Sequence, residues 1–175
     1  MNVRKALPKD LPALLAIFDH ARAFMAAHGN PTQWPPSYPD GELMGQEIAR
    51  GVCYVLEQEG RVEGTFCYIP GVEPTYLKID QGAWPDDRPY ATIHRLASAG
   101  RVHGVADACF AWCAAQGLPL RADTHHDNRI MQHLLERSGF VRCGRIFTDN
   151  NTPRIAYCRA AAPAADRCGA GKGSQ

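Results

Sequence analysis

The chain has 175 residues, with 19 basic and 18 acidic side chains and a formal net charge of +1. This length is typical of one domain, and the balanced charge excludes the basic excess that marks many nucleic-acid-binding proteins. The sequence has no apolar run of the roughly 20 residues that a membrane helix needs, and no apolar secretion signal follows Met1. We therefore expect a cytoplasmic protein that binds neither nucleic acid nor membranes.

Apolar spacing and turn residues predict the elements in chain order. The first half is expected to form a strand over 2–7, a helix from 10 to 28, a proline-rich loop over 29–41, a helix over 40–50 and hairpin strands over 52–56 and 61–69. The second half is expected to form a loop over 70–89 with a strand at 75–79, a strand over 90–97, a helix over 101–116, a strand over 119–123, a helix over 127–138 and strands over 140–145 and 154–159.

This order of elements is typical of a single mixed α/β domain, which we place at residues 1–159. Residues 160–175 are rich in Ala, Gly and Pro and have no apolar pattern. Such a composition cannot bury enough apolar surface to fold, so it predicts a disordered tail.

The seven cysteines are odd in number and include no Cys-x-x-Cys pair, which argues against a disulfide framework or a zinc ribbon. We expect most of these thiols to pack as small buried apolar groups. Adjacent residues of an extended chain point to opposite sides. We therefore expect no metal site at His125, His126 and Asp127.

The segment from Arg101 to Ala106 joins a predicted strand to a predicted helix through small residues. Backbone N–H groups at such a turn, together with the helix dipole, attract a phosphate group. Gly104 permits close approach of a ligand, and Arg101 adds positive charge. Neither a Walker loop nor a dinucleotide fingerprint fits these residues, and an ordinary strand-to-helix turn remains the alternative.

The pattern Arg101-x-x-Gly104-x-Ala106 resembles the Arg/Gln-x-x-Gly-x-Gly/Ala motif of the GCN5-related N-acetyltransferase (GNAT) superfamily. Asn128 follows at the family's spacing, and Gly139-Phe140 closes the next helix, as in the family's Asn…Gly-Phe segment. The order of elements agrees as well, so the resemblance covers about residues 2–159. It implies an α/β fold in which helices flank a mixed, mostly antiparallel central sheet, with a splayed cleft between the fourth and fifth strands.

The resemblance also implies direct transfer of an acetyl group from acetyl-CoA to an amine of a small molecule or peptide. It places the pantetheine arm beside Asn128 and along the fourth strand, at Leu96, Ala97 and Ser98. It places the pyrophosphate on the turn made by Arg101, Val102, His103, Gly104, Val105 and Ala106. Dimers are common in the family, so a homodimer stays open.

An amine must be neutral to attack a thioester, so direct transfer needs a base. His94 on the fourth strand is our candidate, because histidine titrates near neutral pH and some family members carry histidine at the matching position. The alternative is a half-buried, hydrogen-bonded strand histidine. Gln33, Trp34 and Tyr38 fall in the loop that walls the acceptor side in the family, although Trp34 could simply anchor that loop.

One position departs from the family pattern. Leu135 stands where many members carry a tyrosine that protonates the leaving thiolate. His133, Cys143 or water could replace it, or the thiolate could leave unassisted. The departure keeps a second function open, a non-catalytic acyl-CoA-binding module of the same fold. A third, a cysteine hydrolase, has no supporting motif.

Overall fold

The structure is a computed structural model that describes residues 1–161, so the tail proposed at 160–175 lies outside the described residues except for its first two positions. The helices are η1 (Pro8–Asp10), α1 (Leu11–Ala27), α2 (Gly41–Ala49), η2 (Pro74–Tyr76), α3 (Val105–Ala115) and α4 (Arg129–Arg137), where η denotes a 3-10 helix. The strands are β1 (Asn2–Lys5), β2 (Cys53–Gln58), β3 (Arg61–Pro70), β4 (Ala91–Ser98), β5 (Leu120–Thr124), β6 (Val141–Phe147) and β7 (Pro153–Arg159).

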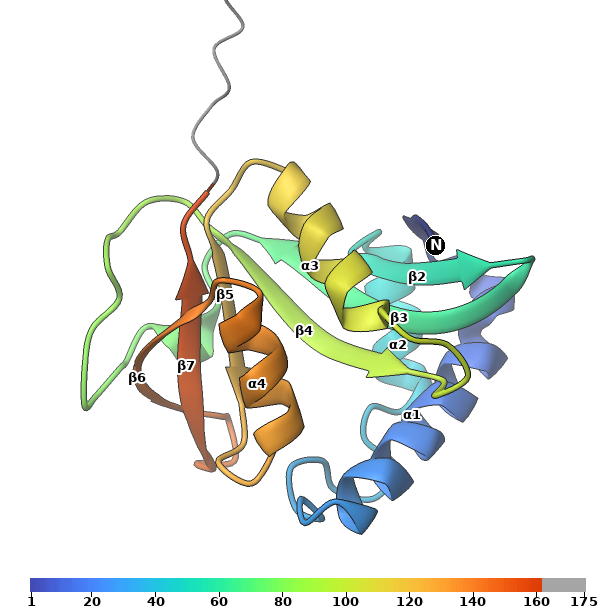
Figure 1. Cartoon of the computed structure of the whole chain (residues 1–175), viewed down its shortest axis with the longest axis horizontal. Coiled ribbons are helices and arrows are strands. Elements are labelled where there is room, and N and C mark those ends of the chain that lie inside the picture. The colour runs from blue at the N-terminus through green and yellow to red at the C-terminus, as the bar shows by residue number, and fades with distance from the viewer. Residues whose placement is uncertain (162–175) are drawn as a thin grey trace, which may run out of the picture.

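Residues 1–161 form one seven-stranded sheet in the order β1-β2-β3-β4-β5-β7-β6 (Figure 1). Every neighbouring pair is antiparallel except β4 and β5, which run parallel. This arrangement confirms the predicted mixed, mostly antiparallel sheet with flanking helices. The parallel pair requires a crossover, and α3 supplies it.

Helices cover both faces of the sheet. In Figure 1, α3 and α4 lie in front of the strands and α2 lies behind them. One core joins α3 and α4 to the sheet through Phe66, Phe110, Leu135 and Tyr157. A second core joins α1 and α2 to the opposite face, with side chains that include Leu14, Phe18, Met44 and Val55.

Polar side chains fix where two of the helices begin. The carboxylate of Asp40 accepts a hydrogen bond of 2.8 Å from the Leu43 N–H at the start of α2. The side chain of Asn128 accepts one of 3.0 Å from the Met131 N–H at the start of α4. Each contact satisfies one of the N–H groups that the first helical turn leaves free.

Three local predictions were wrong. The strand expected at 75–79 is absent, and η2 begins there instead, because Pro74 suits the first position of a helical turn and the Glu73 side chain accepts a hydrogen bond from the Thr75 N–H. The helix expected from 101 begins at Val105, because Gly104 adopts a left-handed backbone with φ of 81° and ends the preceding turn there. The helix expected from 127 begins at Arg129, because the side chain of Asn128 caps it.

Within residues 1–161, no helix combines the length and the apolar character needed to cross a bilayer.

Candidate functional site

Strands β4 and β5 separate soon after they meet. Within the described residues they share two registered pairs, Ala91 with Leu120 and Thr92 with Arg121. Beyond these pairs β5 remains bonded to β7, while the edge of β4 that faced β5 has no strand beside it (Figure 1). This divergence confirms the splayed cleft between the fourth and fifth strands. It also leaves the backbone of Leu96–Ser98 accessible to another hydrogen-bonding chain.

A cavity of about 360 Å³, hereafter the smaller cavity, lies where β4 ends and α3 begins. It is lined by the cap residue of α3, Gly104, and by the first three residues of that helix, Val105, Ala106 and Asp107. The N–H groups of a helix's first turn have no partner inside the helix. The smaller cavity therefore has the donors and the dipole that favour an anionic group.

Most of the residues proposed to hold the cofactor come together around this cavity. Nine of the ten line it: Leu96, Ala97, Ser98, Val102, His103, Gly104, Val105, Ala106 and Asn128. Their roles in binding the cofactor stay predictions.

The tenth residue, Arg101, does not line the smaller cavity. Its guanidinium lies 3.0 Å from the Glu63 carboxylate and donates a hydrogen bond of 2.9 Å to the Val62 carbonyl. The Glu63 side chain is 5% exposed, so its negative charge needs this partner. The geometry therefore assigns the Arg101 guanidinium a structural ion pair.

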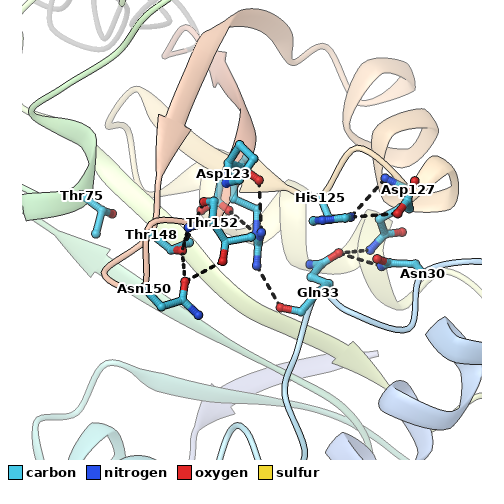
Figure 2. A network of polar contacts seen from close by, with 12 residues as sticks. Asn30, Gln33, Thr75, Asp123, His125, Asp127, Thr148, Asn150 and Thr152 are labelled. Carbon is cyan, nitrogen blue, oxygen red and sulfur yellow. Dashed lines mark hydrogen bonds and ion pairs between the residues drawn. The ribbon is translucent and has the colours of Figure 1, made fainter.

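Asn128 lines the smaller cavity and is bonded to Gln33 of the proline-rich loop, whose contact with Asn30 is visible in Figure 2. The Asn128 amide donates a hydrogen bond of 2.9 Å to the side-chain oxygen of Gln33. The same oxygen accepts a hydrogen bond of 2.8 Å from the Asn30 amide. The backbone carbonyl of Gln33 accepts 2.9 Å from Arg154 on β7. Gln33 thus holds its loop against α4 and β7 at once.

A second cavity, of about 690 Å³ and hereafter the larger cavity, lies along β4 on the β5 side. Gln33, Trp34, Leu96 and Met131 line both cavities, so the two spaces adjoin. Trp34 packs edge-on against Phe18 and Tyr38, which gives this shared wall a rigid aromatic surface. The three residues predicted for the acceptor side, Gln33, Trp34 and Tyr38, all line the larger cavity.

His94 lines the larger cavity and is paired with a carboxylate that the sequence did not reveal. Its Nε2 lies 3.0 Å from Oε2 of Glu73, and both side chains are about one-fifth exposed. A carboxylate only accepts hydrogen bonds, so Nε2 carries the hydrogen and the neutral ring has its lone pair on Nδ1. The hydrogen bond from His94 lowers the pKa of the Glu73 carboxyl from 4.5 to about 2, and burial opposes the shift. Glu73 therefore stays ionised at neutral pH and orients the ring.

A second missed residue, Arg95, lies beside His94. Successive strand residues ordinarily face opposite sides, but His94 and Arg95 both line the larger cavity. The pairing of β3 with β4 shifts register between Thr65 and Cys67, and Arg95 has a φ of 54°. This β-bulge turns the Arg95 side chain into the cavity.

The two histidines before α4 lie differently from the prediction. The segment turns rather than running extended, and the rings of His125 and His126 lie side by side with centroids 4.2 Å apart. The side chains of His125 and His126 therefore do not point to opposite sides, and that prediction was wrong. His125 Nδ1, 3.3 Å from the Asp127 N–H, already accepts a hydrogen bond from it. Burial lowers the pKa of His125, which favours its neutral form. The absence of a metal role stays a prediction.

Leu135 is 1% exposed and packs in the core beside the larger cavity. Neither suggested replacement acid, His133 or Cys143, lines either of the two cavities. Cys143 lies against Cys158, and burial raises the pKa of its thiol to about 12. A thiol of that pKa is a poor nucleophile at neutral pH, which also argues against a hydrolase built on Cys143.

No family model matches this chain, and no curated protein matches it. Solved structures do. A GNAT-family acetyltransferase from Streptococcus agalactiae has 29% identity and a TM-score of 0.82, covering 93% of this chain and 96% of its own. A ribosomal-protein-alanine N-acetyltransferase from Brucella melitensis has 20% identity and a TM-score of 0.63, covering 91% of this chain and 99% of its own. The GNAT-like decarboxylase GphF, in complex with isobutyryl-CoA, has 16% identity and a TM-score of 0.63, covering 93% of this chain and 100% of its own.

The two comparisons below 25% identity show a shared fold, and the Streptococcus structure adds similarity of sequence over almost the whole chain. The chain has the GNAT fold and resembles the GNAT superfamily, as its sequence motifs predict.

Proposed function

We propose that this protein is an acetyl-CoA-dependent N-acetyltransferase that moves an acetyl group directly to an amine of a small molecule or peptide. One observation carries the proposal. Adjoining cavities place a helix N-terminus suited to a phosphate group at one end and the His94–Glu73 pair at the other. Direct transfer requires this arrangement, because the cofactor and the acceptor must meet between an anion site and a base.

The neighbouring structures support the cofactor class. Two of them are acetyltransferases, and the third, the GNAT-like decarboxylase GphF, was solved in complex with isobutyryl-CoA. In this chain the pyrophosphate would lie on the first turn of α3, and the pantetheine arm would bond to the open edge of β4 at Leu96–Ser98. The shared wall at Trp34 and Leu96 would then hold the thioester.

The reaction at that wall needs one displacement and the loss of two protons from the acceptor nitrogen. His94 Nδ1 takes the first proton from the ammonium, directly or through water, and the neutral nitrogen attacks the thioester carbon. A C–N bond forms, the C–S bond breaks, the thiolate leaves, and the nitrogen gives its second proton to that thiolate or to water. The ionised Glu73 stabilises the imidazolium that forms on His94. A backbone N–H on the open edge of β4 would stabilise the charge that develops on the carbonyl oxygen.

A second function is favoured by Leu135. Its side chain is buried and cannot donate a proton to the thiolate. A non-catalytic acyl-CoA-binding module would have the same smaller cavity and no turnover. The transferase is preferred because the His94–Glu73 pair has no role in a binding module.

The test is calorimetric titration with acetyl-CoA, followed by measurement of CoA release with a panel of amines. Gly104→Asp and Gly117→Asp form a matched pair. Both glycines are left-handed, with φ of 81° and 85°, and an added Cβ meets no atom within 4 Å at either. They flank opposite ends of α3, and Gly104 alone of the two lines the smaller cavity.

We expect Gly104→Asp to weaken acetyl-CoA binding at least tenfold, because it places a negative charge beside the pyrophosphate. Gly117→Asp is expected to bind as the parent does. Equal affinities of the two variants would refute this placement of the cofactor. Binding without turnover on a broad panel of amines would favour the acyl-CoA-binding module.

A further inference from the structure

The β-bulge in β4 gives the larger cavity a cation that the transfer chemistry does not require. Arg95 lies on β4 beside His94, and its side chain is 15% exposed. It has a φ of 54°, a left-handed conformation that residues other than Gly, Asn and Asp rarely adopt. Such strain persists only where surrounding contacts hold it, and it is concentrated at functional sites. The strain here brings a guanidinium into the cavity.

The surroundings of Arg95 leave this end of the cavity positive. Its Nη1 lies 3.4 Å from Glu47, and Nη1 of Arg50 lies 3.4 Å from the other oxygen of the same carboxylate. The Nε of Arg95 donates to the hydroxyl of Tyr38 at 3.1 Å, and this partner is neutral. Two guanidinium groups therefore share one carboxylate, and all three side chains line the larger cavity.

The other end of the same cavity is negative. Glu73 is ionised and bonded to His94, which has to be neutral when it acts as a base. Asp123 accepts 2.8 Å from the Tyr76 hydroxyl, and its nearest cation, Arg154, is 3.8 Å away. Glu73, Asp123 and Arg154 all line the cavity, and the charge of Arg154 offsets that of Asp123. A ligand in the cavity therefore meets the carboxylate of Glu73 beside His94 and the guanidinium of Arg95.

We propose that the acceptor is an amine that also carries an anionic group, as an amino acid does, with its nitrogen at His94–Glu73 and its anion at Arg95. This inference rests on the proposed function. A guanidinium presents parallel N–H donors that match a carboxylate, and a partly buried site strengthens the pair. A neutral or polycationic amine would leave the excess positive charge near Arg95 without a partner.

The experiment compares the twenty common amino acids with their carboxamides, which keep the amine and lose the negative charge. Turnover is followed by CoA release, and binding by ligand-observed NMR, which needs no turnover. Three proteins are compared: the parent, Arg95→Asn and Glu47→Gln. Asparagine tolerates a left-handed backbone, so the first substitution removes the cation while retaining the bulge.

For at least one amino acid we expect the parent to prefer the acid over its amide at least tenfold in kcat/KM. Arg95→Asn is expected to bring that ratio to within threefold of unity, chiefly by slowing the reaction of the acid. Glu47→Gln removes the competing carboxylate and is expected to raise the ratio. If Arg95 had a merely structural role, the two substitutions would not change the ratio of acid to amide turnover in opposite directions.

Turnover of amides at rates equal to or above those of the acids would overturn the inference and leave the transferase standing. So would a preference for the acid that Arg95→Asn leaves unchanged. If no amine of either kind turns over, the transferase proposal fails, and the NMR comparison decides the ligand class. Binding of an acid but not its amide, lost in Arg95→Asn, supports the inference, and equal binding overturns it. If Arg95→Asn does not fold, Glu47→Gln decides in its place. A raised ratio of acid to amide turnover supports the inference, and an unchanged ratio overturns it.

Discussion

The Nε2 atom of His94 lies 3.0 Å from Oε2 of Glu73. This contact joins the middle of β4 to the residue that caps η2. The pKa of the Glu73 carboxyl is lowered to about 2 by this hydrogen bond. A carboxyl whose pKa is lower in the folded protein than in the unfolded chain adds stability above its unfolded value, here near 4.5. That contribution is lost as the pH falls from about 4.5 to about 2.

Glu73→Gln is therefore expected to lower the free energy of unfolding by about 1–2 kcal/mol at pH 7, because it replaces the charged acceptor of the His94 hydrogen bond with a neutral one. The difference from the parent should shrink below pH 4.5 and vanish near pH 2. Urea unfolding at pH 7, 4 and 3 measures it. A constant difference over that range would show that Glu73 does not titrate as described.

His94→Gln tests the base. Glutamine can still donate a hydrogen bond to Glu73 but cannot take a proton from the acceptor. We expect kcat to fall by about 10²–10⁴, while the affinity for acetyl-CoA stays within twofold. The limb of the pH–rate profile that reports the base should disappear. His28→Ala is the control, since His28 is exposed at the end of α1 and lines neither cavity. A parent-like profile in His94→Gln would exclude His94 as the base.

Gly64→Ala tests the close packing of β3 under the start of α3. A Cβ at Gly64 would clash with Cγ1 of Val105 and lie 3.1 Å from the carbonyl oxygen of Ala97. We expect a loss of about 1–3 kcal/mol in the free energy of unfolding. Weaker acetyl-CoA binding should accompany it, because Val105 and Ala97 both line the smaller cavity.

Gly45→Ala is the matched control for that substitution. Gly45 lies inside α2, and an added Cβ there meets no atom within 4 Å. Alanine is the better helix former, so stability should rise by about 0.5–1 kcal/mol. If both variants change stability by the same amount, crowding at Gly64 is not the cause.

Arg101→Ala separates the two roles considered for that arginine. Its guanidinium pairs with the buried Glu63 outside the smaller cavity. We therefore expect stability to fall by about 1–3 kcal/mol, because Glu63 loses its charged partner, while acetyl-CoA affinity changes less than threefold. Thermal unfolding and calorimetry measure the two effects. A tenfold loss of affinity in a folded variant would return Arg101 to the pyrophosphate site.

The sequence could predict the order of elements along the chain from local patterns, and the splayed cleft from the resemblance to the GNAT motif. The turn at Gly104 is an example, since its small residues indicate a helix N-terminus that a ligand can approach. Asn128 was also predicted at the site, but its cap and its bond to Gln33 appear only in the structure. Sequence spacing places a residue on an element and does not show which partner its side chain chooses.

The charged half of the site could not be predicted in the same way. Glu73 lies in a Gly- and Pro-rich loop without periodicity, and its partner is 21 residues away. Arg95 required a β-bulge, which breaks the alternation from which strand faces are inferred. Glu47 reads as an ordinary residue of an amphipathic helix, although its carboxylate contacts a strand 48 residues later. These contacts depend on tertiary packing.

The divergence of β4 from β5 also has a consequence for the motion of the sheet. Two residue pairs in the described chain connect strands β1–β4 to strands β5–β7, so the sheet is divided into two hydrogen-bonded blocks with a narrow seam. Amides on the open edge of β4 can bond only to water or to a ligand. Deuterium should therefore enter that edge faster than its interior neighbours, and a ligand lying along the seam would act as an additional strand that slows its uptake.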